Sequence, residues 1–168
     1  MQSSESSLRS STQKIIARIR KVRKAADKAA KSKRRCADYR YLRAVLWAYM
    51  YFEDNDLLSY LVETAPSVLM TPVRKNWHPL RVIIEATCIQ PDLRMRSRWT
   101  RALEYALTEK IDPKELARFL RANNGIAGCA DLASKTRPKR GQLESRIEAK
   151  GCRFTLSPNL PLGLHRTH

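Results

Sequence analysis

The apolar residues of this chain recur with the period of an α-helix from near its start. Between residues 12 and 35 they follow one another at intervals of four and three positions, at Ile15, Ile19, Val22, Ala26 and Ala29. Residues at these intervals share one narrow stripe, so the pattern predicts a helix over residues 12–35. Residues 1–11 are rich in serine and show no such period, which predicts a flexible lead-in.

Larger apolar side chains begin after Cys36 and change the pattern. From Leu42 to Phe52 they cover nearly all faces of a helix, which predicts a buried central helix. Pro66 is expected to end the next helix and Pro79 to open another, because proline fits the first turn of a helix but interrupts its interior. The connections between these segments are short, which favours helices packed against their neighbours in the chain.

The clearest amphipathic pattern lies between Asp92 and about Glu109. One face of this predicted helix is apolar, and the opposite face carries Arg94, Arg98, Arg101 and Tyr105. Guanidinium groups about one turn apart suit successive phosphates, and a tyrosine ring can stack on a base. A solvated basic face is the alternative interpretation. The charges are of one sign only, which favours phosphate binding.

Two short helices around an Asn-Asn-Gly turn are predicted between Asp112 and Lys135. These lengths suit a helix-turn-helix that reads DNA. The second helix nevertheless opens with Ile, Ala, Gly, Cys and Ala at 126–130, whereas a reading helix carries polar side chains there. The alternative, which these residue types favour, is a tight helical corner that brings basic residues to a phosphate surface: Lys135, Arg137, Lys139 and Arg140.

Together these patterns predict an all-α fold, a single bundle of about five or six helices. Its core domain is expected over residues 36–136, preceded by the long basic helix at 12–35. Residues 137–168 mix basic residues with glycine and proline, which predicts a loosely structured basic tail.

The charge of the chain points to a polyanionic partner. Its 33 lysines and arginines outnumber 16 acidic residues, giving a formal net charge of +17 and a sequence pI near 10.3. Such an excess attracts phosphate backbones. The N-terminal helix holds the densest group of candidate phosphate contacts: Arg18, Arg20, Lys21, Arg23, Lys24, Lys28, Lys31, Lys33, Arg34 and Arg35.

Motifs for catalysis or metal binding are missing from the sequence. It has no G-x-S-x-G, no glycine-rich phosphate loop and no H-E-x-x-H. His78 is a conceivable general base, but a single histidine before a proline-led helix start is more often structural. The four cysteines lie far apart, and the histidines are at no zinc-ligand spacing from them. We therefore expect no enzymatic activity, no cofactor and no bound metal.

No apolar run approaches the roughly 20 residues of a membrane helix, and the first residues lack the apolar segment of a signal peptide. We expect no membrane association and a location in the cytoplasm, the nucleoid or the nucleus.

These observations lead to one hypothesis and one alternative. The hypothesis is a non-enzymatic nucleic-acid-binding protein, regulatory or accessory, or a subunit of a nucleoprotein complex. DNA is favoured over RNA because of the helix-turn-helix-like corner. The alternative is a small adaptor or inhibitor that binds a protein or nucleoprotein partner through its positive surface. Salt separates them, because phosphate contacts weaken steeply with salt and an interface anchored by aromatic residues does not.

Overall fold

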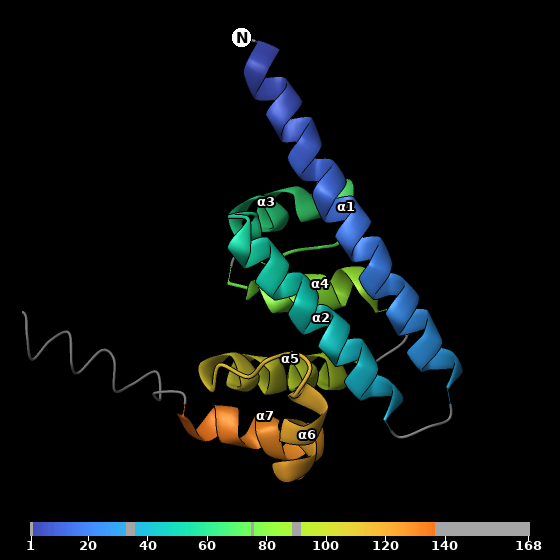
Figure 1. Ribbon diagram of the computed structural model, residues 1–168, viewed down its shortest axis with the longest axis vertical. Helices are drawn as coiled ribbons and strands as arrows, with labels where there is room; N and C mark the ends of the chain where they lie inside the picture. Colours follow the sequence, from blue (N-terminus) through green and yellow to red (C-terminus); the bar gives the residue numbers. More distant parts are fainter. Residues whose placement is uncertain (1, 33–35, 75, 89–91, 137–168) are drawn as a thin grey trace, which may run out of the picture. The chain divides into compact units, whose positions relative to one another are not determined.

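Seven α-helices and no strands make up the part of the chain that the structure describes, residues 2–32, 36–74, 76–88 and 92–136 (Figure 1). This computed structural model confirms the all-α prediction, while the count exceeds the predicted five or six. Four helices are followed by a residue with positive φ, which ends a helix sharply and separates it from the next. These residues are Asp56, Met70, Lys110 and Asn124. The predicted tail, residues 137–168, lies outside the described residues.

The first two helices run side by side in opposite directions (Figure 1). They are α1, Gln2–Lys31, and α2, Ala37–Asp54. The flexible lead-in predicted for residues 1–11 is wrong, because α1 is already helical from Gln2. The chain has no glycine or proline before Pro66, so nothing in the sequence breaks the helix on its N-terminal side. Thr12 lies within this helix, and its hydroxyl lies 2.7 Å from the Tyr60 hydroxyl of α3.

The predicted stripe of α1 does face the core, where Ile15, Ile19 and Val22 are buried. Burial of each such side chain stabilises the fold by about 1.5–3 kcal/mol, which attaches α1 to the rest of the bundle. The described helices accordingly form one compact unit. In α2, Leu42, Leu46 and Phe52 are fully buried, as expected for a central helix.

Two shorter helices cover the inner side of α1 and α2: α3, Leu58–Val68, and α4, Pro79–Thr87. Pro66 does not end α3 as predicted, because the helix continues through it for two more residues. So close to the C-terminal end, the missing N–H group of proline costs only one hydrogen bond of the last turn. Pro79 does open α4, and His78 Nδ1 accepts a hydrogen bond of 3.2 Å from the Leu80 N–H. His78 therefore serves as a helix cap.

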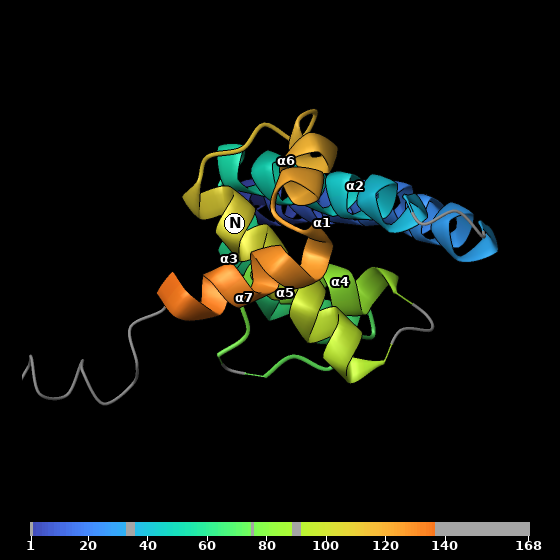
Figure 2. The ribbon, with the colours of Figure 1, turned by 90° about the horizontal axis from the view of Figure 1, so that it is seen from below.

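Three helices complete the described part: α5, Leu93–Thr108; α6, Leu116–Ala122; and α7, Gly125–Thr136. The last of them packs along α5 (Figure 2). Asn124 and Gly125 form the turn into α7 with φ angles of 58° and 80°, as the Asn-Asn-Gly sequence predicts. Gly128 allows the corner to close, since a Cβ atom there would lie 2.0 Å from the Asn123 carbonyl oxygen.

A buried ionic cluster joins α4 to α5. Arg81 Nη2 lies 2.5 Å from Glu85 Oε1, and Arg96 pairs with the other oxygen of the same carboxylate. Arg81 also donates a hydrogen bond of 3.0 Å to the Ser97 hydroxyl and lies 5.4 Å from the centre of the Trp77 ring. This cluster fixes the start of α5 against α4.

Candidate nucleic-acid interface

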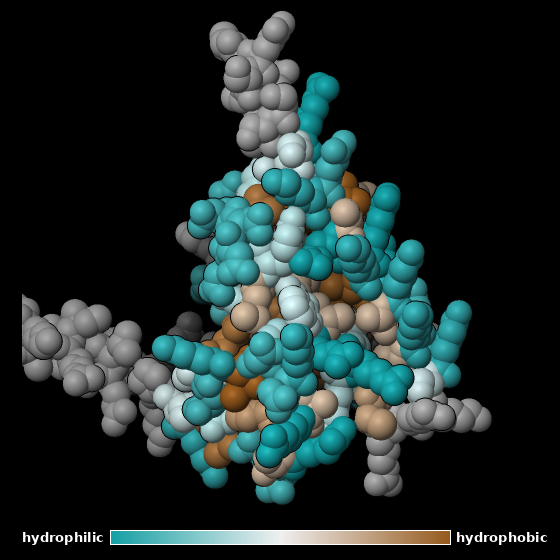
Figure 3. All heavy atoms as spheres, in the orientation of Figure 1, coloured by the Kyte–Doolittle hydropathy of each residue, from teal (hydrophilic) through white to brown (hydrophobic). Residues whose placement is uncertain are grey.

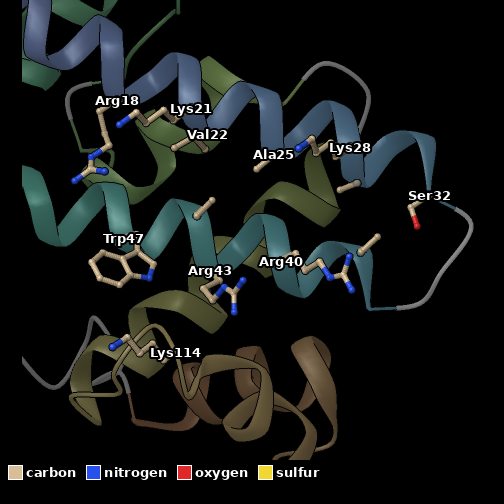
Figure 4. Close-up of a pocket in the computed structure, with 13 residues that line it drawn as sticks. Arg18, Lys21, Val22, Ala25, Lys28, Ser32, Arg40, Arg43, Trp47 and Lys114 are labelled. Atoms are coloured by element: carbon tan, nitrogen blue, oxygen red, sulfur yellow. The ribbon is translucent and has the colours of Figure 1, made fainter.

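A groove of about 450 Å³ runs between α1 and α2 and is lined by positive charge (Figure 4). Among the lining residues that the structure describes, none is acidic and six are cations: Arg18, Lys21, Lys28, Arg40, Arg43 and Lys114. Small residues such as Ala25, Ala29 and Ala44 line it as well. Trp47 is the one aromatic residue of the groove.

The spacing of residues along the two helices explains why these side chains meet. On α1, positions 18, 21, 25, 28 and 32 alternate by three and four and so share one face. On α2, positions 40, 43 and 47 do the same. With a rise of about 1.5 Å per residue, the α1 row from Arg18 to Lys28 extends over about 15 Å. Lys114 joins them from the turn that precedes α6.

None of the six groove cations is neutralised by a carboxylate among the described residues. The three ion pairs in that part of the protein are Arg81–Glu85, Arg96–Glu85 and Arg118–Glu115. The groove therefore concentrates like charges, which attracts a polyanion. Hydrophilic side chains project along α1 and α2 on the face drawn in Figure 3.

Trp47 is 46% exposed, although it stands in the middle of a helix with eight buried residues. The prediction that α2 is buried on nearly all faces is therefore wrong for the face of Arg40, Arg43 and Trp47. The side chain of Trp47 carries an indole, which is among the largest apolar groups in proteins, and nearly half of the residue is exposed to solvent. In Figure 4 the ring lies at one end of the groove, between Arg18 and Lys114.

The basic residues predicted to contact phosphate near the N-terminus differ in their positions. Arg18, Lys21 and Lys28 line the groove, and Arg20, Lys24 and Lys31 are exposed on α1 outside it. Arg23 Nη2 donates a hydrogen bond of 2.7 Å to the Ala86 carbonyl oxygen, so this residue ties α1 to the end of α4. Lys33, Arg34 and Arg35 lie outside the described residues.

The predicted stripe of α5 is only partly open to solvent. Arg94 and Arg98 are exposed. Arg101 Nη1 instead donates a hydrogen bond of 2.9 Å to the Ser134 hydroxyl of α7. Tyr105 is half-buried, with its ring centre 5.6 Å from that of Phe119. Two of the four residues thus contribute to helix packing, which leaves Arg94 and Arg98 as the solvent-facing pair.

The corner between α6 and α7 has the outline of a helix-turn-helix, but its second helix, α7, carries little charge. The charged residues of α7 are Asp131 and Lys135, both exposed. Arg137, Lys139 and Arg140 lie outside the described residues. Cys129 and Ala130 pack inward, and burial raises the pKa of the Cys129 thiol to about 11. The second helix of the corner, α7, therefore lacks a row of polar side chains that could read bases.

Arg40, Arg43, Trp47 and Lys114 were not among the predicted site residues. The first three carry a signal in the sequence, since a tryptophan shares a helical face with two arginines at intervals of three and four. Such a face is unusual for a fully buried helix. Lys114 carries no comparable signal, because its position in the groove depends on how α6 packs against α2.

Among the described residues, no group of three or more His, Cys, Asp or Glu side chains is placed to hold a metal ion. None of the described helices is both long enough and apolar enough to span a membrane. Comparison of the chain with protein-family models, with curated proteins and with solved structures finds no match.

Proposed function

We propose that this protein binds nucleic acid, with the phosphate backbone held in the groove between α1 and α2. The supporting observation is that six cations surround this groove while no carboxylate lines it or pairs with them among the described residues. Arginine binds phosphate through two parallel N–H groups, and lysine acts as a compact point charge. α1 supplies both types, α2 supplies two arginines, and the turn before α6 adds Lys114.

The energy of such binding is mainly electrostatic. Each neutralised phosphate releases a condensed counterion, so the logarithm of the association constant falls linearly with the logarithm of salt concentration. The slope is about 0.9 per contact for duplex DNA and about 0.7 for a single strand. If all six groove cations contact phosphates of a single strand, they contribute a slope of about four.

The proposed role is non-enzymatic, either regulatory or accessory, or as a subunit of a nucleoprotein complex. The preference for DNA over RNA rests on the helix-turn-helix-like corner. The charged residues of its second helix, α7, are Asp131 and Lys135. The groove contacts proposed here are to phosphates, which DNA and RNA share. DNA therefore remains the first ligand to test, and RNA is its necessary comparison.

A second candidate function is binding of an acidic protein or nucleoprotein partner as an adaptor or inhibitor. Three large apolar side chains outside the groove favour it, because Met70, Leu93 and Met95 are exposed to solvent. Exposed apolar residues often mark protein interfaces. Leu93 and Met95 lie on α5 and Met70 follows α3, and none of them lines the groove in which the cations gather, so nucleic acid is the better supported partner.

Fluorescence-anisotropy titrations of labelled duplex DNA, single-stranded DNA and RNA of equal length test the proposal. We expect submicromolar binding near physiological salt and a straight log–log decrease as salt rises. Polyglutamate serves as a competitor that carries charge but no phosphate or base. Binding of polyglutamate as tight as that of nucleic acid would contradict the proposal and favour the acidic protein partner.

A further inference from the structure

The groove also holds a feature that phosphate binding alone does not use. We infer that it accepts a single-stranded segment of nucleic acid, with an unpaired base stacked on the indole of Trp47. This inference rests on the proposed function and adds to it the form of the ligand and the residue that selects it.

The exposure of Trp47 is the first observation. The residue is 46% exposed, while Trp99 is buried and Trp77 is half-buried. Trp47 lines the same groove as Arg43 and Lys114, so a backbone held by these cations brings its bases to the indole. Single-strand binding proteins combine these two parts, a basic groove and an aromatic platform.

The position of Arg18 is the second observation. Its guanidinium carbon lies 4.0 Å from the centre of the Tyr51 ring, one helical turn from Trp47 on α2. The contact holds this cation at the end of the groove where the indole lies. A phosphate bound by Arg18 would therefore leave the adjoining base within reach of Trp47.

The form of the ligand follows from the chemistry of the indole. The bases of a duplex are stacked on one another, whereas an unpaired base offers a free ring face to Trp47 in the groove. A single strand is therefore the form of nucleic acid that suits this groove.

Trp47→Ala tests the inference against an oligothymidylate of about 12 nucleotides and a hairpin duplex of the same strand length. Stacking of one base contributes enough that we expect single-strand binding to weaken about fivefold or more. The salt slope should stay the same, because no charge is removed. Trp47→Phe should restore most of the affinity, and duplex binding should change little. Circular dichroism and a melting curve for each variant show that it is folded.

Tryptophan fluorescence gives an independent readout. The change on adding oligothymidylate to the natural protein, minus the change with Trp47→Phe, isolates the signal of Trp47. We expect quenching by the single strand and little by the duplex. Unchanged single-strand affinity in Trp47→Ala without quenching would overturn the inference, while the proposed function would stand if the protein still binds. Quenching by polyglutamate would overturn it in favour of an acidic polypeptide. Failure to bind any nucleic acid would overturn both.

Discussion

Arg18 of α1, which lines the groove, forms a cation–π contact with Tyr51 of α2, with 4.0 Å between the guanidinium carbon and the ring centre. An arginine side chain loses considerable conformational entropy when it binds a phosphate. Because Tyr51 already restrains Arg18, less of this entropy remains to be lost on binding. The contact joins two helices, and it would also prepare the groove for the proposed nucleic-acid ligand.

Replacing Tyr51 with leucine tests this preparation. The variant keeps an apolar side chain of similar size but removes the ring face, worth about 0.5–1 kcal/mol at an exposed site. We expect nucleic-acid affinity to fall about two- to fivefold, with the salt slope unchanged because Arg18 keeps its charge. An anisotropy titration measures both quantities. A changed slope with unchanged affinity at low salt would contradict the proposed role of Tyr51.

Replacing Gly128 with alanine tests the corner between α6 and α7. The added Cβ would lie 2.0 Å from the Asn123 carbonyl oxygen and 2.9 Å from the Asn124 Cβ, so the backbone must move. We expect a loss of about 2 kcal/mol or more in the free energy of unfolding, measured by urea denaturation. Ala127→Ser changes the adjacent exposed residue and should stay within about 0.5 kcal/mol. Equal stability of the two variants would show that the corner is not closely packed.

Replacing Glu85 with glutamine tests the buried ionic cluster. Its side chain is 8% exposed and serves Arg81 and Arg96 together, so the variant leaves two cations without their counter-charge. We expect a destabilisation of about 3 kcal/mol or more in urea denaturation. Glu115→Gln is the matched control, because its carboxylate is 61% exposed and pairs with Arg118 at 3.8 Å. That change should cost less than about 1 kcal/mol.

The reactivity of the cysteines tests the packing of α7. Cys129 is 0% exposed and its thiol pKa is raised to about 11, whereas Cys36 is exposed. Near pH 8 we expect iodoacetamide to modify Cys36 readily and Cys129 only after denaturation, as followed by peptide mass spectrometry. Modification of both at similar rates in the folded protein would contradict the buried position.

The raised thiol pKa also fixes the direction of a pH effect. An unfolded cysteine ionises near pH 8.5, whereas folded Cys129 holds its proton to about pH 11. Between these values the unfolded state binds fewer protons, so the free energy of unfolding falls as pH rises. Cys129→Ala should reduce this alkaline loss, measured by denaturation at a series of pH values. An unchanged pH dependence in this variant would assign the loss to other groups.

The period of apolar residues predicted much of the fold and part of the site. Ile15, Ile19 and Val22 carry that signal, because a core stripe requires apolar side chains at helical spacing. The continuation of α1 to Gln2 could not be predicted, since serine-rich sequence is compatible with helix and with coil alike. The prediction that Pro66 ends α3 was wrong for a related reason. The cost of a proline in a helix depends on how close it lies to the helix end, which the sequence does not fix.

Only the α1 cations of the groove were among the predicted site residues, because the groove itself forms only where two helices pack together. Arg18, Lys21 and Lys28 belong to a helix whose charge is evident from the sequence, but which of its faces meets α2 depends on tertiary packing. The surroundings of Arg101 also depend on tertiary packing. Its position on a basic stripe suggested phosphate binding, whereas it donates a hydrogen bond to Ser134 of α7.

The most direct test of the groove as the nucleic-acid interface compares it with a second basic surface, from which the same number of charges is removed. Arg40→Gln with Arg43→Gln removes two cations from the groove, and Arg94→Gln with Arg98→Gln removes two exposed cations from α5. The measurement is the salt dependence of oligothymidylate binding for the natural protein and both variants. We predict that the groove variant lowers the log–log slope by about 1.4 and that the α5 variant leaves it nearly unchanged. An unchanged slope in the groove variant, with a reduced slope in the α5 variant, would contradict the assignment of the groove as the nucleic-acid interface.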